Sequence, residues 1–128
     1  MRLIQVAQRA ADLERASAFY SRLLGSEPSG RFDPPGLLFF DLDGVRLLLD
    51  RSAPSSLIYL DVADLRRSVE ELRASGAKIV QEPQLVYNHV DGSLGPAGTE
   101  EWMAFIEDSE GNTVGLVGRE ASRGASRA

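Results

Sequence analysis

The sequence contains no cysteine, one histidine, one tryptophan and two methionines. Without cysteine the chain cannot form disulfides, thiolate metal sites or a cysteine nucleophile. No stretch approaches the roughly 18 consecutive apolar residues that a membrane span requires, and the amino terminus has no long apolar core. These absences predict a cytoplasmic protein without membrane or sulfur chemistry.

Basic residues are also few. The chain has 14 Lys and Arg against 19 Asp and Glu, for a net charge of −5, and no basic cluster. Nucleic acids and anionic membranes attract proteins through a concentrated Lys/Arg surface, so we expect neither as a partner. The 128 residues, 43% of them hydrophobic, suit one compact domain with its own core.

What the chain does contain is an internal repeat. Asp12-Leu13-Glu14-Arg15 aligns with Asp64-Leu65-Arg66-Arg67 at an offset of 52 residues. Each copy runs from a short apolar strand through an acidic helix start into an amphipathic helix that ends at glycine. A repeat of this length predicts two similar modules, and a cleft between two such modules is a natural ligand site.

The first module follows a strand–helix–strand–strand–strand pattern. Asp12 is the expected N-cap of a helix, since apolar residues then recur at three- and four-residue spacings. Gly25 is expected to end this helix in the left-handed backbone conformation. Asp43-Gly44 is a strong two-residue hairpin signal. Ser29–Gly36 is expected to be a loop, with a weak strand near Arg31-Phe32 inside it. The main expected elements are a strand over Leu3–Ala7, a helix from Asp12 to Gly25, and strands over Leu37–Leu42 and Val45–Leu49.

The second module repeats this pattern after a short linker, Ala53–Ser56. Pro83 is expected to stop the strand that begins at Lys78 or to place it at a sheet edge. Tyr87–Gly98 is polar and Gly-rich, and we expect a long loop there. The expected elements are strand Leu57–Val62, a helix from Asp64 to Gly76, and strands Lys78–Gln81, Glu101–Glu107 and Thr113–Val117.

The domain boundaries follow from these elements. We expect one domain over residues 1–118, with module one at about 1–52 and module two at about 56–118. Residues 119–128 have no apolar period and are expected to be disordered. The hairpin glycines Gly44 and Gly111 are 67 residues apart, against 52 for the helix caps, so the second module carries an insertion. We place this insertion in the Tyr87–Gly98 loop and expect it to influence specificity.

Three segments resemble the vicinal oxygen chelate superfamily, also called the glyoxalase/bleomycin-resistance/dioxygenase family. They read ADLERASAFYSRLLG, VADLRRSVEELRASGAKIVQEP and WMAFIEDSEGNTVGLV. The last is similar to the family's closing hairpin, aromatic-x-x-Asp-Pro-x-Gly-Asn, with Ser109 in place of the proline. The resemblance implies an α+β fold of two tandem βαβββ modules, whose sheets form a curved open barrel around a cleft. It also implies a homodimer.

Metal-dependent members of this family hold a divalent ion through the first and last strand of each module, typically with His and Glu. Matched to this chain by distance from the helix caps, these positions carry Gln5, Leu48, Leu57 and Gly115. A shift by two residues brings in Ala7, Asp50, Tyr59 and Val117, with one carboxylate. Divalent ions favour imidazole and carboxylate ligands, so we expect neither a metal nor another cofactor.

Five side chains are candidates for contacting a ligand. Gln5 and Asp50 would be polar groups in an otherwise apolar pocket, although Asp50 also suits a solvated strand end. Tyr59 and Trp102 would be stacking walls for a flat molecule, or core residues. His89 is a potential general base or hydrogen-bonding group, or a plain loop residue.

The function that we favour at this stage is a metal-free protein that binds a small, partly apolar organic molecule in the cleft. The alternative is a glyoxalase-type lyase, isomerase or dioxygenase. Such an enzyme would use His89 as an acid/base or an unconventional metal site made by Gln5, Asp50 and His89. A third option is an interaction module whose cavity is filled by its own side chains.

Overall fold

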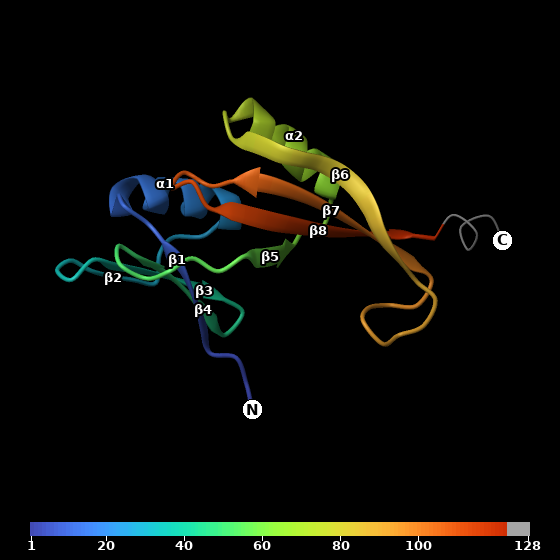
Figure 1. Ribbon diagram of the computed structural model, residues 1–128, viewed down its shortest axis with the longest axis horizontal. Helices are drawn as coiled ribbons and strands as arrows, with labels where there is room; N and C mark the ends of the chain where they lie inside the picture. Colours follow the sequence, from blue (N-terminus) through green and yellow to red (C-terminus); the bar gives the residue numbers. More distant parts are fainter. Residues whose placement is uncertain (123–128) are drawn as a thin grey trace. The chain divides into compact units, whose positions relative to one another are not determined.

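The computed structural model describes residues 1–122. Contacts divide the chain into two compact units (Figure 1). Unit 1 contains residues 1–57 and the turn 108–112, and among the described residues unit 2 contains 58–107 and 113–122. In chain order the elements are β1 (Gln5–Arg9), α1 (Leu13–Leu24), β2 (Gly30–Phe32), β3 (Leu37–Leu42), β4 (Val45–Asp50), β5 (Ile58–Asp61), α2 (Leu65–Ala74), β6 (Lys78–His89), β7 (Thr99–Glu107) and β8 (Thr113–Ala121).

Both halves of the chain have the same βαβββ order and the same sheet topology. The strand order is β1-β4-β3-β2 in one sheet and β5-β8-β7-β6 in the other. In each sheet the first strand pairs in parallel with the last, and the remaining pairs are antiparallel. The expected α+β fold with tandem βαβββ modules is therefore confirmed, whereas the single domain over residues 1–118 stays a prediction.

In unit 1, α1 packs against one face of its sheet. The helix begins after Asp12, whose carboxylate accepts a hydrogen bond from the backbone N–H of Arg15, and Gly25 follows it with φ at 69°. Tyr20 lies against Phe40 with the ring centroids 6.1 Å apart. Burying one such large side chain contributes about 1.5–3 kcal/mol. The buried apolar residues of this core include Leu13, Ala16, Tyr20, Leu38, Phe40, Leu47 and Leu49.

In unit 2, α2 covers one face of the other sheet. Asp64 caps this helix as expected, accepting a hydrogen bond from the N–H of Arg67. The helix lies close to β8, since a Cβ added at Gly118 would be 2.6 Å from the Cβ of Leu65. The buried side chains of this core include Ile58, Leu65, Val69, Leu72, Ala104, Ile106, Val114 and Leu116.

Three boundaries in unit 2 differ from the sequence prediction. β6 continues past Pro83 to His89, because it is an edge strand with irregular pairing between Gln81 and Gln84, so the missing N–H of proline breaks no ladder. The expected loop therefore begins after His89 and not at Tyr87. β8 extends to Ala121, since pairing with β7 continues to Thr99. The start of the 119–128 segment is thus a strand and not disordered, while 123–128 lie outside the described residues.

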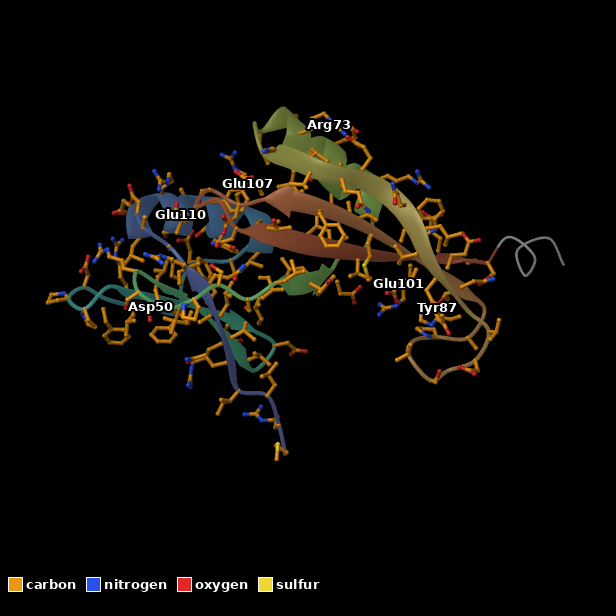
Figure 2. The ribbon with its side chains drawn as sticks, viewed as in Figure 1. Asp50, Arg73, Tyr87, Glu101, Glu107 and Glu110 are labelled. Carbon is orange, nitrogen blue, oxygen red and sulfur yellow. The ribbon has the colours of Figure 1, made fainter. Side chains whose placement is uncertain are left out.

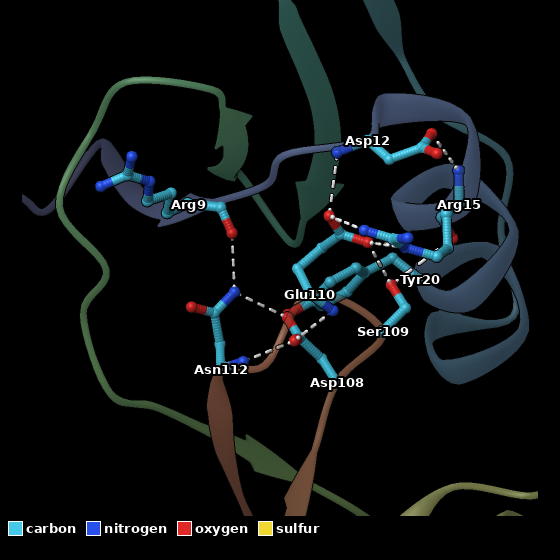
Figure 3. A network of polar contacts seen from close by, with 8 residues as sticks. All are labelled: Arg9, Asp12, Arg15, Tyr20, Asp108, Ser109, Glu110 and Asn112. Atoms are coloured by element: carbon cyan, nitrogen blue, oxygen red, sulfur yellow. Dashed lines mark hydrogen bonds and ion pairs between the residues drawn. The ribbon is translucent and has the colours of Figure 1, made fainter.

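The turn between β7 and β8, Asp108–Asn112, belongs to unit 1 and is held there by side chains (Figure 3). The Asp108 carboxylate accepts hydrogen bonds from the backbone N–H groups of Glu110, at 2.8 Å, and Asn112, at 2.7 Å. It also accepts one from the Tyr20 hydroxyl, at 2.6 Å. Burial and the nearby charge of Asp108 raise the pKa of Tyr20 far above its usual value, so this hydroxyl remains a donor.

Asn112 extends this network to β1. Its amide donates to the backbone carbonyl of Arg9 at 2.7 Å and to Asp108 at 2.9 Å. Gly111 has the positive φ, 86°, that the turn requires, whereas Asn112 does not. Gly111 therefore serves the turn through its backbone, as expected of a hairpin glycine. Asn112 acts through its side chain.

Glu110 makes the strongest charged contact of the turn. Its fully buried carboxylate accepts from the Arg15 guanidinium at 2.7 Å and from the backbone N–H of Asp12 at 2.9 Å. Burial alone would raise the pKa of Glu110, but the hydrogen bonds from Arg15, Asp12 and Ser109 outweigh it and lower the pKa. The ionised form is therefore stabilised by folding.

We predict that Glu110→Gln destabilises the protein at neutral pH by about 1–2 kcal/mol, because charged hydrogen bonds are lost. A lowered folded-state pKa gives stability above the unfolded-state pKa that disappears as pH falls through the folded-state value. The difference from wild type should therefore shrink below about pH 4. Urea unfolding at pH 7 and pH 3 measures both free energies. The control is Glu14→Gln, which changes an exposed carboxylate on α1, the helix that Glu110 contacts through Arg15. An equal pH dependence in both variants would contradict the prediction.

Between residues 1 and 122, neither helix is long and apolar enough to cross a membrane.

Candidate functional site

The residues at the family's four metal positions do not suit a divalent ion. Gln5 offers an amide oxygen, and this oxygen already accepts a hydrogen bond from Nε of Arg46 at 2.8 Å. Leu48 and Leu57 offer no donor atom. Gly115 has no side chain, and a Cβ there would lie 2.7 Å from the ring of Tyr59. In each unit the side chains at these positions lack the imidazole and carboxylate groups that a divalent ion favours.

The positions two residues away are no better suited. Asp50 is the one carboxylate among them, and it accepts hydrogen bonds from the backbone N–H and hydroxyl of Ser52, at 2.9 and 3.1 Å. Across residues 1–122, no three His, Asp or Glu side chains gather in a way that could hold a metal ion.

Gln5 and Asp50 lie at opposite ends of one strand pair. In the parallel register of β1 and β4, Gln5 is opposite Arg46, and Asp50 is opposite Arg9. Each carries its own local hydrogen bonds. The structure therefore does not bring these two predicted site residues together, and their role in ligand binding stays a prediction.

Trp102 lies on the α2 side of the sheet in unit 2. Its indole N–H donates to Glu100 at 3.1 Å, and the guanidinium of Arg66, on α2, lies 4.7 Å from the ring centroid. Trp102 is opposite Gly118, the glycine that Leu65 contacts. Since side chains alternate along a strand, residues 59, 101, 103 and 105 point to the other face. Trp102 is thus separated by the sheet from the other aromatic candidate, Tyr59.

We call the other side of this sheet, facing away from α2, the Tyr59 face. Tyr59 is 51% exposed, and its ring packs edge-on against Phe105 with centroids 6.0 Å apart. Gly115 leaves room for both rings, since a side chain there would clash with each. The apolar part of the Tyr59 face consists of Tyr59, Met103, Phe105, Gly115 and Val117.

One end of the Tyr59 face is polar. Glu101 on β7 is opposite Arg119 on β8, and Arg119 donates to Asp61 on β5 at 3.1 Å. On the β6 side, Nε2 of His89 lies 2.9 Å from Oε1 of Glu101. Figure 2 shows Glu101 next to Tyr87 at this end. An apolar surface bordered by a few polar groups is the usual composition of a small-molecule site.

His89 is buried at 2% exposure and is not a plain surface-loop residue. The Tyr87 ring packs edge-on against the imidazole, with centroids 4.7 Å apart. Gly95, in the loop that follows β6, lies so close that an added Cβ would be 2.9 Å from Cε1 of the ring. Two predicted site residues, Tyr59 and His89, therefore share one face of the sheet.

Two residues of this polar end were missed by sequence reasoning. The sequence prediction has Glu101 only as the first residue of a strand, and it has Arg119 in a segment expected to be disordered. The signal was present for Glu101: adjacent carboxylates on a strand face opposite ways, and Glu100 and Glu101 do so, one toward Trp102 and one toward His89. Its pairing with His89 could not be predicted because β6 was expected to end before His89.

Several solved structures have the same fold as this chain. UcmS2 has 23% identity and a TM-score of 0.69, over 91% of this chain and 97% of its own. Lactoylglutathione lyase from Agrobacterium tumefaciens has 20% identity and a TM-score of 0.69, over 91% and 92%. A superfamily member from Sphaerobacter thermophilus DSM 20745 has 20% identity and a TM-score of 0.67, over 92% and 97%. At such identities the likeness shows the fold alone.

No protein with a curated description matches the sequence. A family model, by contrast, matches residues 2–116, which is most of the chain. The repeated βαβββ order, the shared sheet topology and this match agree. The chain belongs to the Glyoxalase/Bleomycin resistance protein/Dioxygenase superfamily.

Proposed function

We propose that this protein binds a small, partly apolar organic molecule on the Tyr59 face and does so without a metal ion. The observation that supports this most is the composition of that face. An aromatic pair, the half-exposed Tyr59 and the partly buried Phe105, continues through Met103 and the buried Val117 to a polar end. The apolar part would hold the body of the ligand, and the polar end would orient it.

Membership of the superfamily supports a small-molecule ligand but does not choose the chemistry, since one scaffold hosts many reactions. The donor atoms at the four metal positions favour binding without metal over a metal-dependent reaction. The alternative is a glyoxalase-type enzyme that uses an unconventional metal site at Gln5, Asp50 and His89, or His89 as an acid/base without metal. Only the first form requires metal affinity, so a metal titration separates that form from the proposal.

We predict that Mn²⁺, Ni²⁺, Co²⁺ and Zn²⁺ leave the melting temperature of the protein unchanged. A ligand that binds only the folded state would stabilise it by about 2.7 kcal/mol at 100 times its Kd, which a thermal-shift assay detects easily. Metal analysis of the purified protein is the companion measurement. One equivalent of metal together with an upward shift would overturn the metal-free proposal and favour the enzyme.

We predict that Gly115→Ala weakens ligand binding several-fold, because the new methyl group would displace the rings of Tyr59 and Phe105. The probe is 2-methoxynaphthalene, a flat neutral aromatic, titrated into ¹⁵N-labelled protein. Its amide shift changes should map to Tyr59, Met103, Phe105 and Val117.

Ala18→Ser is the control for this substitution, since it also adds one heavy atom but at an exposed position of α1 in unit 1. It should bind the probe as wild type does. Shift changes confined to other elements, or equal binding by Gly115→Ala, would contradict the assignment of the Tyr59 face.

We also propose a homodimer formed through β6. This strand is the edge of its sheet and carries a run of large apolar side chains that are each nearly half exposed, Leu85, Val86 and Tyr87. An uncovered edge offers unpaired backbone N–H and C=O groups to a second strand. A two-fold axis would bring two such edges together in an isologous contact.

We predict that Val86→Lys converts the dimer to a monomer, because two lysines would face each other across the axis. Sedimentation velocity measures the change. Leu94→Lys, in the exposed loop after β6, is the control and should stay dimeric. A monomeric wild type at micromolar concentration would rule out the dimer.

A further inference from the structure

One nitrogen of the His89 imidazole has a hydrogen-bond partner, and the other has none among residues 1–122. Nε2 contacts the Glu101 carboxylate at 2.9 Å, whereas Nδ1 is buried and no group among residues 1–122 forms a hydrogen bond with it. A buried polar atom without a partner costs about 1–3 kcal/mol, so it calls for an explanation.

The partner of Nε2 determines what Nδ1 can do. An ionised carboxylate only accepts hydrogen bonds, so the Glu101 contact requires a proton on Nε2. In a neutral imidazole the other nitrogen then carries a lone pair and accepts. Glu101 therefore holds His89 in the tautomer whose Nδ1 is an acceptor, an arrangement in which a carboxylate orients a base.

The loop after β6, residues 90–98, lies over this nitrogen. Gly95 approaches Cε1, Nε2 and Nδ1 of the ring, and the backbone N–H of Gly98 donates to the His89 carbonyl at 2.8 Å. Val90 and Leu94 are 81% and 74% exposed, so the loop contributes little apolar burial of its own. A segment of this kind opens at low free-energy cost.

We propose that Nδ1 of His89 is the hydrogen-bond acceptor for a hydroxyl group of an aromatic ligand, reached when the 90–98 loop moves aside. This inference rests on the proposed function and names the chemical class of the ligand. The acceptor requires a donor on the ligand, and a phenol-type hydroxyl is a good donor. The nearby ring of Tyr87 and the side chain of Met103, two residues along β7 from Glu101, form the apolar surroundings for the aromatic body.

The charges at this end agree with a donor rather than an anion. At the polar end of the Tyr59 face, Glu101 and Asp61 are carboxylates. Arg119, the cation beside them, is already paired with Asp61. An anionic ligand group has no proton to donate to the lone pair of Nδ1, and the nearby carboxylate of Glu101 would repel it. A neutral hydroxyl meets neither obstacle.

The first test uses the fact that His89 is the only histidine of the chain. The ring-nitrogen resonances of ¹⁵N-histidine-labelled protein report its tautomer directly. Near pH 7.5 we expect a proton on Nε2 and none on Nδ1. The opposite tautomer, or protons on both nitrogens, would overturn the proposal without any ligand being involved.

The second test compares 2-naphthol with 2-methoxynaphthalene, which differ in the hydroxyl proton. We expect 2-naphthol to move the Nδ1 resonance and to bind roughly three- to tenfold more tightly, the usual effect of one hydrogen bond. The methyl ether should leave Nδ1 unmoved. Equal effects of the two probes on Nδ1, or no effect of either, would overturn the proposal.

Glu101→Gln provides the matched variant, since an amide no longer fixes the tautomer. We expect a mixture of tautomers and loss of the preference for 2-naphthol. Glu100→Gln changes the adjacent carboxylate on the opposite face and should preserve both. If the two probes bind at Met103 and Val117 equally and without moving His89, the proposed function stands and the hydroxyl assignment fails. If neither probe binds, both fail.

Discussion

The carboxylate of Asp108 is the interaction on which much of the arrangement depends. It accepts four hydrogen bonds, two from backbone N–H groups of its own turn, one from the side-chain amide of Asn112 and one from the Tyr20 hydroxyl. These bonds fix the turn between β7 and β8 inside unit 1. The turn sets where β7 ends and where β8 begins, and these two strands carry most of the Tyr59 face.

The same network explains why the closing motif tolerates Ser109 in place of proline. Proline would stiffen the turn through its fixed φ, but here the carboxylates on either side of position 109 hold the backbone. Asp108 binds the turn from within, and Glu110 binds Arg15 and the backbone of Asp12. The closing motif thus holds the turn in place, and its presence does not indicate which reaction or ligand the protein has.

The chemistry lies instead in the side chains that the two sheets expose. Gln5, Leu48, Leu57 and Gly115 carry neither an imidazole nor a carboxylate, whereas the βαβββ scaffold around them is intact. At Gly115 the space that a side chain would fill is occupied by Tyr59 and Phe105. Gly115 is therefore part of an apolar surface.

Much of the fold could be predicted from the sequence, because its signals are local. Caps at Asp12 and Asp64, the glycines after each helix and the Asp43-Gly44 hairpin each act within a few residues, and each is found where expected. The candidate site could be predicted only in part. His89 was noticed as a lone histidine, but its partner Glu101 depends on how far β6 pairs, and pairing is a long-range property.

The pairing of β6 has an evolutionary consequence. Its register against β7 shifts at three places, between Ile79 and Gln81, between Gln81 and Gln84, and between Leu85 and Tyr87. Side chains alternate with a period of two, so the gain or loss of one residue in this stretch exchanges the two faces downstream. An insertion would place Asn88 where His89 lies now, and a deletion would place Val90 there. Since an edge strand tolerates such length changes, relatives of this protein can alter what faces Glu101 by a single-codon insertion or deletion, without any substitution in the site itself.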